Sequence, residues 1–316
     1  MPTSIVRRLA ISRLRLFTAA QWLLAVAIVW YAASALRGQW AEAGERLASI
    51  RPQWMWIAAA TALVVATYVL LIETWRRVVV ATGERLSFSN AARIWFVSNL
   101  GKYVPGKIWS IAAMTMMARE SSVSAGAAAG SSILVQIVAV ASGIGVAVVT
   151  GAQALDQPYL AAIVAVVILA ALIAMPKALP IAARMISSAT GRAFAPPPIK
   201  ASTIWGCVAA SVISWLAYGV AFELFVRGTL GNAAGATTSY IAVYAASYII
   251  GFLALFAPGG AVVRESAIVT GMLRLGLSGQ ADALAVAVAS RLWLTVTELL
   301  PGIAYMALGK RASRSE

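Results

Sequence analysis

The sequence predicts an all-α, polytopic membrane protein with about six spanning helices and two re-entrant or broken helical hairpins, arranged as an inverted repeat. Of its 316 residues, 61% are hydrophobic and 11% are charged, and the mean hydropathy is +0.84. A soluble domain could not bury so much apolar surface. The formal charge is +14, but the basic residues form short clusters between long uncharged stretches, as in membrane-protein loops. This pattern argues against a nucleic-acid-binding protein.

Two residue types narrow the possible chemistry. Cys207 is the single cysteine and lies in an apolar run, so no disulfide framework is expected. Histidine is absent, which excludes zinc proteases of the H-E-x-x-H type, Ser-His proteases and phosphatases with a histidine nucleophile. We therefore expect no catalytic residues, no metal and no cofactor, and the chain is not expected to be an enzyme.

The predicted spans are apolar stretches long enough to cross about 30 Å of hydrocarbon as helices. They are residues 16–36, 54–72, 125–150, 159–175, 201–222 and 283–307. The first follows an arginine cluster without a cleavage pattern, so we expect a retained helix. Residues 39–53 carry apolar residues at helical spacing, which suits a short interfacial helix or an ordinary linker. Residues 176–200 are basic and contain three consecutive prolines, which predicts a cytoplasmic connecting loop.

Two further apolar segments are interrupted by glycine and proline. Residues 89–120 are broken around Pro105 and Gly106, and residues 238–274 are broken at Pro258-Gly259-Gly260. Proline removes a backbone donor, so the freed backbone must be buried in protein or line a wet cavity. Each segment therefore predicts a helical hairpin with a Pro-Gly tip.

The charge of the loops favours hairpins that return to their starting side. If both return, the basic segments and both termini lie in the cytoplasm, whereas two crossing segments would export the basic loop at 177–200. Residues 238–256 are long enough to span alone, so a crossing segment remains the alternative. The predicted location is the inner membrane of a bacterial-type cell.

A short pattern recurs in the two halves of the single membrane domain, residues 1–316. Tyr68-x4-Glu73-x3-Arg77 is matched by Tyr218-x4-Glu223-x3-Arg227, and a hairpin follows each copy. This predicts two units of opposite orientation, residues 53–150 and 201–308, as in transporters with alternating access. Chance remains the alternative, because the match is short.

Charged side chains within the apolar stretches are candidate functional residues, because each costs about 2.5–3.5 kcal/mol in a bilayer. Arg291 and Glu298 lie seven residues apart in the last span, so they form either a headgroup or coupling-ion site or a structural ion-pair network. Arg264 and Glu265 follow the second hairpin tip. A helix that begins after that tip would direct free N–H groups and a positive dipole end at a phosphate.

The remaining candidates are the lysines at the first tip and the two recurring pairs. Lys102 and Lys107 flank the first tip, where they would either bind the same anion or extend to the lipid headgroups. The pairs Glu73/Arg77 and Glu223/Arg227 are candidate gates, or alternatively ordinary i,i+4 pairs within a helix.

The stretch SNLGKYVPGKIW at residues 98–109, together with Ala257-Pro258-Gly259-Gly260 and Arg264-Glu265, resembles the lysylphosphatidylglycerol synthase transmembrane family. That family includes the flippase part of bacterial multiple peptide resistance factors. Val262 departs from its P-G-G-x-G-x-R-E pattern, in which a glycine is usual. The resemblance covers most of the chain and implies a lipid-translocating membrane domain. Too few residues follow residue 307 for the soluble aminoacyl-transferring domain, so a stand-alone member is expected.

The leading hypothesis is a flippase-like transporter that binds an anionic lipid headgroup, of a phospholipid or a polyprenyl-phosphate lipid, between the two hairpins. The alternatives are a membrane glycosyltransferase with Glu42 or Glu45 as base, and a non-transporting protein that presents lipid to an envelope glycosyltransferase or synthase. The first alternative is weaker, because the loop that carries Glu42 and Glu45 is short.

Overall fold

The computed structural model describes residues 44–46, 48–103, 108–154, 158–190, 199–254, 260 and 262–312. Regular structure in these residues is entirely helical, as predicted. The helices are α3 (Trp54–Ala81), α4 (Phe88–Asn99), the 3-10 helix η1 (Leu100–Tyr103), α5 (Ile108–Glu120), α6 (Ala125–Thr150), the 3-10 helix η2 (Ala152–Ala154), α7 (Pro158–Thr190), α8 (Ala201–Leu230), α9 (Thr237–Leu253), α10 (Val263–Arg274) and α11 (Gln280–Ala312).

Five helices in the described part of the chain are long and apolar enough to cross a membrane. They are α3, α6, residues 159–178 of α7, α8, and residues 280–305 of α11. These match five of the six predicted spans and confirm a multi-pass membrane protein. The sixth predicted span, residues 16–36, lies outside the described residues.

Several helices continue past their predicted ends. α3 extends through its charged segment to Ala81, and α8 extends to Leu230. α7 contains Pro176 and Pro180 and continues to Thr190, so much of the loop predicted at 176–200 is helical. The basic and proline content suggested a loop, but the intervening Ala, Leu, Met and Arg residues favour a helix. Pro301 likewise lies inside a helix, α11.

Both interrupted segments fold as helical hairpins whose two ends lie on the same side. In the first, the Ser124 backbone N–H after α5 donates to the Glu84 carboxylate before α4, at 3.1 Å. In the second, Gly235 before α9 lies against Leu277 after α10. Each hairpin thus enters and leaves at one end of the helix bundle, as a re-entrant topology requires.

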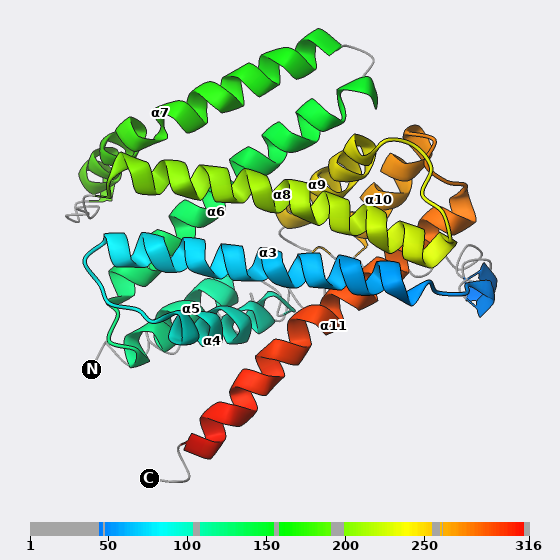
Figure 1. Cartoon of the computed structure of the whole chain (residues 1–316). Helices are drawn as coiled ribbons and strands as arrows, with labels where there is room; N and C mark the ends of the chain where they lie inside the picture. The colour runs from blue at the N-terminus through cyan, green and yellow to red at the C-terminus, as the bar shows by residue number, and fades with distance from the viewer. Residues whose placement is uncertain are drawn as a thin grey trace, which may run out of the picture.

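The long helices α3 and α8 run antiparallel and in contact through the middle of the molecule (Figure 1). At one end, the Gln53 backbone N–H donates to the Gly228 carbonyl at 2.8 Å. Near the middle, the corresponding tyrosines of the recurring pattern meet edge to face, with Tyr68 and Tyr218 ring centroids 6.3 Å apart. This geometry suits two units of opposite orientation, and the repeat itself stays a prediction.

Candidate functional site

A cavity of about 210 Å³ lies where both hairpins meet the long helices. Among the described residues, eight helices line it, namely α3, α4, α5, α6, α8, α9, α10 and α11. Its polar lining residues are Tyr68, Ser98, Asn99, Ser110, Ser132, Gln136, Ser211, Ser214, Tyr218, Tyr244, Tyr248, Arg264 and Glu298. We call it the central cavity. Polar groups inside a membrane domain are costly and usually serve a ligand or a pathway, so this cavity is the candidate site.

Arg264 is the basic residue among the described residues that line the central cavity. It is the second residue of α10 and is 8% exposed. Its guanidinium lies over the Tyr244 ring at 5.0 Å and the Tyr248 ring at 5.2 Å, within the distance for cation–π attraction. The Tyr244 ring in turn stacks on Tyr218, with centroids 5.4 Å apart. A stack of aromatic rings from α8 and α9 thus positions the arginine against the cavity.

Polar atoms in the central cavity lack hydrogen-bond partners among the described residues. They are the hydroxyls of Tyr68 and Ser110 and the Nε of Arg264, and Tyr68 is only 5% exposed. Buried polar groups are nearly always paired, and an unpaired one costs about 1–3 kcal/mol. The residues that carry these atoms line the central cavity, and each of the three groups can donate a hydrogen bond.

The start of α10 adds further donors beside the cavity. Its N-cap residue, Val262, makes no side-chain hydrogen bond to the first turn of the helix, and the first N–H groups of an α-helix have no acceptor within the helix. An anion there would gain from these donors and from the helix dipole. A helix does begin after the second tip, as predicted, whereas its role in binding an anion stays a prediction.

The predicted acidic and basic residues of the last span divide between two places. Glu298 lines the central cavity with Arg264. Arg291 forms an ion pair with Glu265 of α10, with Nε 3.7 Å from Oε1. Arg291 and Glu265 therefore join α11 to the second hairpin. The roles of Arg264, Glu265, Arg291 and Glu298 as binding residues stay predictions.

The candidate gates are ion pairs within their helices, at opposite ends of the α3–α8 pair. Arg77 Nε lies 2.8 Å from Glu73 Oε1, and Arg227 lies 3.5 Å from Glu223. The intrahelical alternative is thus confirmed in geometry, whereas a gating role is untested. Arg227 also lies over the ring of Trp56, 5.0 Å from its centroid, which ties the end of α8 to the start of α3.

The first hairpin contributes Ser98 and Asn99 to the central cavity, directly before the 3-10 helix that contains the backbone of Lys102. The side chain of Lys102 is not described. Lys107, Pro105, Gly106, Pro258 and Gly259 lie outside the described residues, as does Glu42, whereas Glu45 is exposed.

The second hairpin shows why its family pattern favours glycine. Gly260 has φ +70°, and a Cβ placed on it would lie only 2.7 Å from the carbonyl oxygen of Gly251 in α9. Val262, at the position where glycine is usual, has φ +70° and ψ −48°. This is close to the rare, strained γ-turn conformation, and a β-branched residue is an outlier there. The departure in sequence is therefore a site of backbone strain.

Several cavity residues were not predicted from the sequence, namely the tyrosines, serines, Asn99 and Gln136. A signal was available, because Gln136 is a polar residue in an uncharged span and Tyr68 and Tyr218 open the recurring pattern. In the part of the chain that the structure describes, no group of three or more His, Cys, Asp or Glu side chains could hold a metal ion.

Comparison with known proteins agrees with this architecture. A family model described as the lysylphosphatidylglycerol synthase TM region matches residues 8–302, which is nearly the whole chain and includes both hairpins. A comparison with curated proteins gave no match. The chain belongs to the lysylphosphatidylglycerol synthase transmembrane family.

Proposed function

We propose that this chain is a flippase-like transporter that binds the anionic headgroup of a phospholipid or polyprenyl-phosphate lipid in the central cavity and moves it across the membrane. The observation that carries the proposal is Arg264, a buried cation at a helix N-terminus that lies over aromatic rings. The same cavity is lined by Tyr68 and Ser110, whose hydroxyls have no partner in the described part of the chain. A phosphate would accept hydrogen bonds from these donors. Its charge would also offset that of the buried guanidinium.

The size of the central cavity supports a headgroup as its occupant. Its volume of about 210 Å³ is far above the ~10–15 Å³ that holds one water. It is below the ~300–1,000 Å³ of pockets that enclose drug-sized ligands. A phosphate with a small polar substituent fits this range, whereas acyl chains would have to remain in the lipid.

The basic residues of the loops support an orientation in which the end of the bundle where α3 ends and α8 begins faces the cytoplasm. Arg85, Arg119 and Lys200 gather at the end of the bundle where α3 ends and α8 begins. The positive-inside rule places such an end in the cytoplasm, and α11 runs toward the same side (Figure 1). The C-terminus would then be cytoplasmic, and so would an N-terminus separated from α3 by one further span.

The test is lipid movement in vesicles reconstituted with the full chain. Fluorescent phosphatidylglycerol is incorporated in both leaflets, and a membrane-impermeant reductant measures how fast inner-leaflet lipid becomes accessible. Arg264→Gln should lower the rate about 10- to 100-fold, since hydrogen bonds to charged groups contribute about 1.5–3 kcal/mol. Arg274→Gln is the matched control, because Arg274 is an exposed arginine at the other end of α10.

A second variant separates binding from folding. Tyr68→Phe removes a hydroxyl without a described partner, so the protein should be as stable as the parent but move lipid more slowly. If folded Arg264→Gln and Tyr68→Phe proteins both move lipid at the parental rate, the central cavity is not the transport site. Lipid binding by the parent without any movement would instead favour the lipid-presenting protein.

A further inference from the structure

A second cavity, of about 730 Å³, lies between the C-terminal end of α3 and the N-terminal end of α8. We call it the α3–α8 cavity. It lies apart from the central cavity and shares none of that cavity's lining residues. Its polar lining consists of Glu73, Thr74, Arg76, Arg77, Lys200, Ser202, Thr203 and Cys207.

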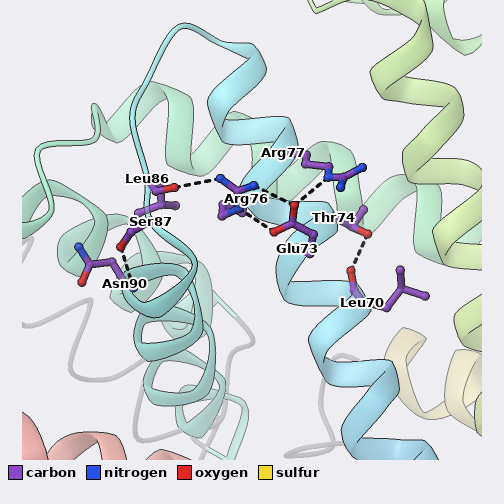
Figure 2. Close-up of polar contacts among 8 residues, drawn as sticks. All are labelled: Leu70, Glu73, Thr74, Arg76, Arg77, Leu86, Ser87 and Asn90. Carbon is purple, nitrogen blue, oxygen red and sulfur yellow. Dashed lines mark hydrogen bonds and ion pairs between the residues drawn. The ribbon is translucent and has the colours of Figure 1, made fainter.

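The charge of this cavity is positive, with three cations and one carboxylate. Glu73 uses both of its oxygens on arginines of its own helix, because Arg76 donates to Oε2 at 2.7 Å and Arg77 donates to Oε1 at 2.8 Å. Arg76 also donates to the Leu86 carbonyl at 3.2 Å. Figure 2 shows Arg76 extending toward the loop that carries Leu86 and Arg77 extending in the opposite direction.

Two of the three cations can reach a ligand. The Arg77 side chain is 73% exposed although its Nε is bonded to Glu73, and Lys200 is exposed at the start of α8. Lys200 is the N-cap of α8 and makes no side-chain cap hydrogen bond. The hydroxyls of Ser202 and Thr203 lie in the first turn of that helix and line the same cavity. Cations and hydroxyls from two helices therefore face one space.

The rest of the wall is apolar and leads along the span. It includes Leu70, Val80 and Ile213, and Val80 and Ile213 are 40% and 54% exposed. In a membrane such residues contact acyl chains. A soluble anion would use only the charged end of the cavity, whereas a lipid would use the charged end and the apolar wall together.

We propose that the α3–α8 cavity is a binding site for an acidic glycerophospholipid, with its phosphate between Arg77 and Lys200 and one acyl chain along Ile213. This site is distinct from the proposed transport site. Zwitterionic lipids would bind more weakly, because their own cation offsets the attraction to the basic side chains. A bound lipid would connect the end of α3 to the start of α8 through Arg77 and Lys200.

The experiment is a titration of the purified full chain, in neutral detergent, with fluorescent phosphatidylglycerol and separately with phosphatidylcholine. Arg264→Gln removes the cation of the proposed transport site and serves as the background. In that background, Arg77→Gln/Lys200→Gln should bind phosphatidylglycerol about 30-fold more weakly, which corresponds to a loss of about 1 kcal/mol per cation at about 1.4 kcal/mol per tenfold change in affinity. The control is Arg85→Gln/Arg119→Gln, which removes two exposed cations at the same end of the bundle but outside the cavity. It should change the affinity less than about threefold.

Gly206→Leu tests the same site without altering its charge. Gly206 lines the cavity, and a Cβ placed on it meets no atom within 4 Å, so the leucine should fold normally and obstruct the lipid. Arg264→Gln should retain binding at this site even if it abolishes transport. Failure of the transport proposal is therefore distinguishable from failure of this one.

Three results would overturn the proposal. The first is equal affinity for phosphatidylglycerol and phosphatidylcholine. The second is loss of binding in Arg264→Gln but not in Arg77→Gln/Lys200→Gln, which would place the lipid in the central cavity. The third is displacement of the lipid by millimolar glycerol phosphate, which would show that the site takes a free phosphate and uses no acyl chain.

Discussion

At Gly219, α8 packs closely against Ile241 of α9. A Cβ built on Gly219 would lie 2.4 Å from the Cα and 2.8 Å from the Cβ of Ile241. Because the nearest of these atoms is backbone, a change of side-chain rotamer cannot relieve the overlap. Gly219→Ala must therefore separate the two helices by about 1 Å to restore a normal contact of about 3.5–4.0 Å.

The magnitude follows from two opposing effects. Alanine is favoured over glycine inside a helix by about 0.5–1 kcal/mol, while forcing atoms into a tightly packed interface costs about 1–3 kcal/mol. The net effect is a loss of about 1–2 kcal/mol in the free energy of unfolding. Gly206→Ala on the same helix meets nothing within 4 Å, so it should gain about 0.5–1 kcal/mol.

Thermal unfolding in detergent measures both variants. Gly219→Ala should lower the midpoint by about 2–5 °C and Gly206→Ala should raise it slightly. Lipid movement should also fall in Gly219→Ala, because Gly219 follows Tyr218, which stacks on the Tyr244 ring under Arg264. The reasoning is refuted if the two variants unfold at the same temperature.

Further predictions concern single contacts. Val262→Gly should relieve the strain of φ +70° and raise the free energy of unfolding by about 1 kcal/mol in thermal melts; a lower melting temperature would contradict this. For the pair Arg291–Glu265, a double-mutant cycle of Arg291→Ala and Glu265→Gln should give a coupling of about 0.5–3 kcal/mol, and strict additivity would argue against the pair. Hydrogen bonds from Ser124, first from its hydroxyl and then from its backbone N–H, lower the pKa of Glu84 in the folded protein. The ionised Glu84 carboxylate therefore stabilises the fold fully above its unfolded pKa, and this contribution is lost as the pH falls through the folded pKa. The difference in melting temperature between Glu84→Gln and the parent should therefore shrink as the pH falls below the unfolded pKa of about 4.3.

The spanning helices could be predicted from sequence because their signal is local. An apolar run long enough to cross the membrane is visible residue by residue, and α6 and α8 begin at the residues predicted. Helix ends were less accurate, since Glu73 and Arg77 look like the end of a span but pair with each other within the helix. Local charge marks the edge of the membrane better than it marks the end of a helix.

The candidate site could be predicted only in part, because its members come from eight helices. Arg264 was identifiable as a costly charge beside a proline-glycine tip. The association of Arg291 with Glu265 depends on how α10 lies against α11, and a pattern within one helix carries no such information. Tyr244 looks like an ordinary apolar-face aromatic until its ring is placed under the guanidinium.

The contacts of Arg264 have a consequence for turnover. Its charge rests against two tyrosine faces, and each such contact contributes about 0.5–2 kcal/mol. A carboxylate bonded directly to a buried arginine would be far harder to displace, since breaking such a pair costs about 3–5 kcal/mol. In the proposed transport cycle, an arriving phosphate would compete with these ring contacts, and when it left the rings would again hold the guanidinium. The proposed free and occupied states would then be close in free energy, which would permit rapid exchange.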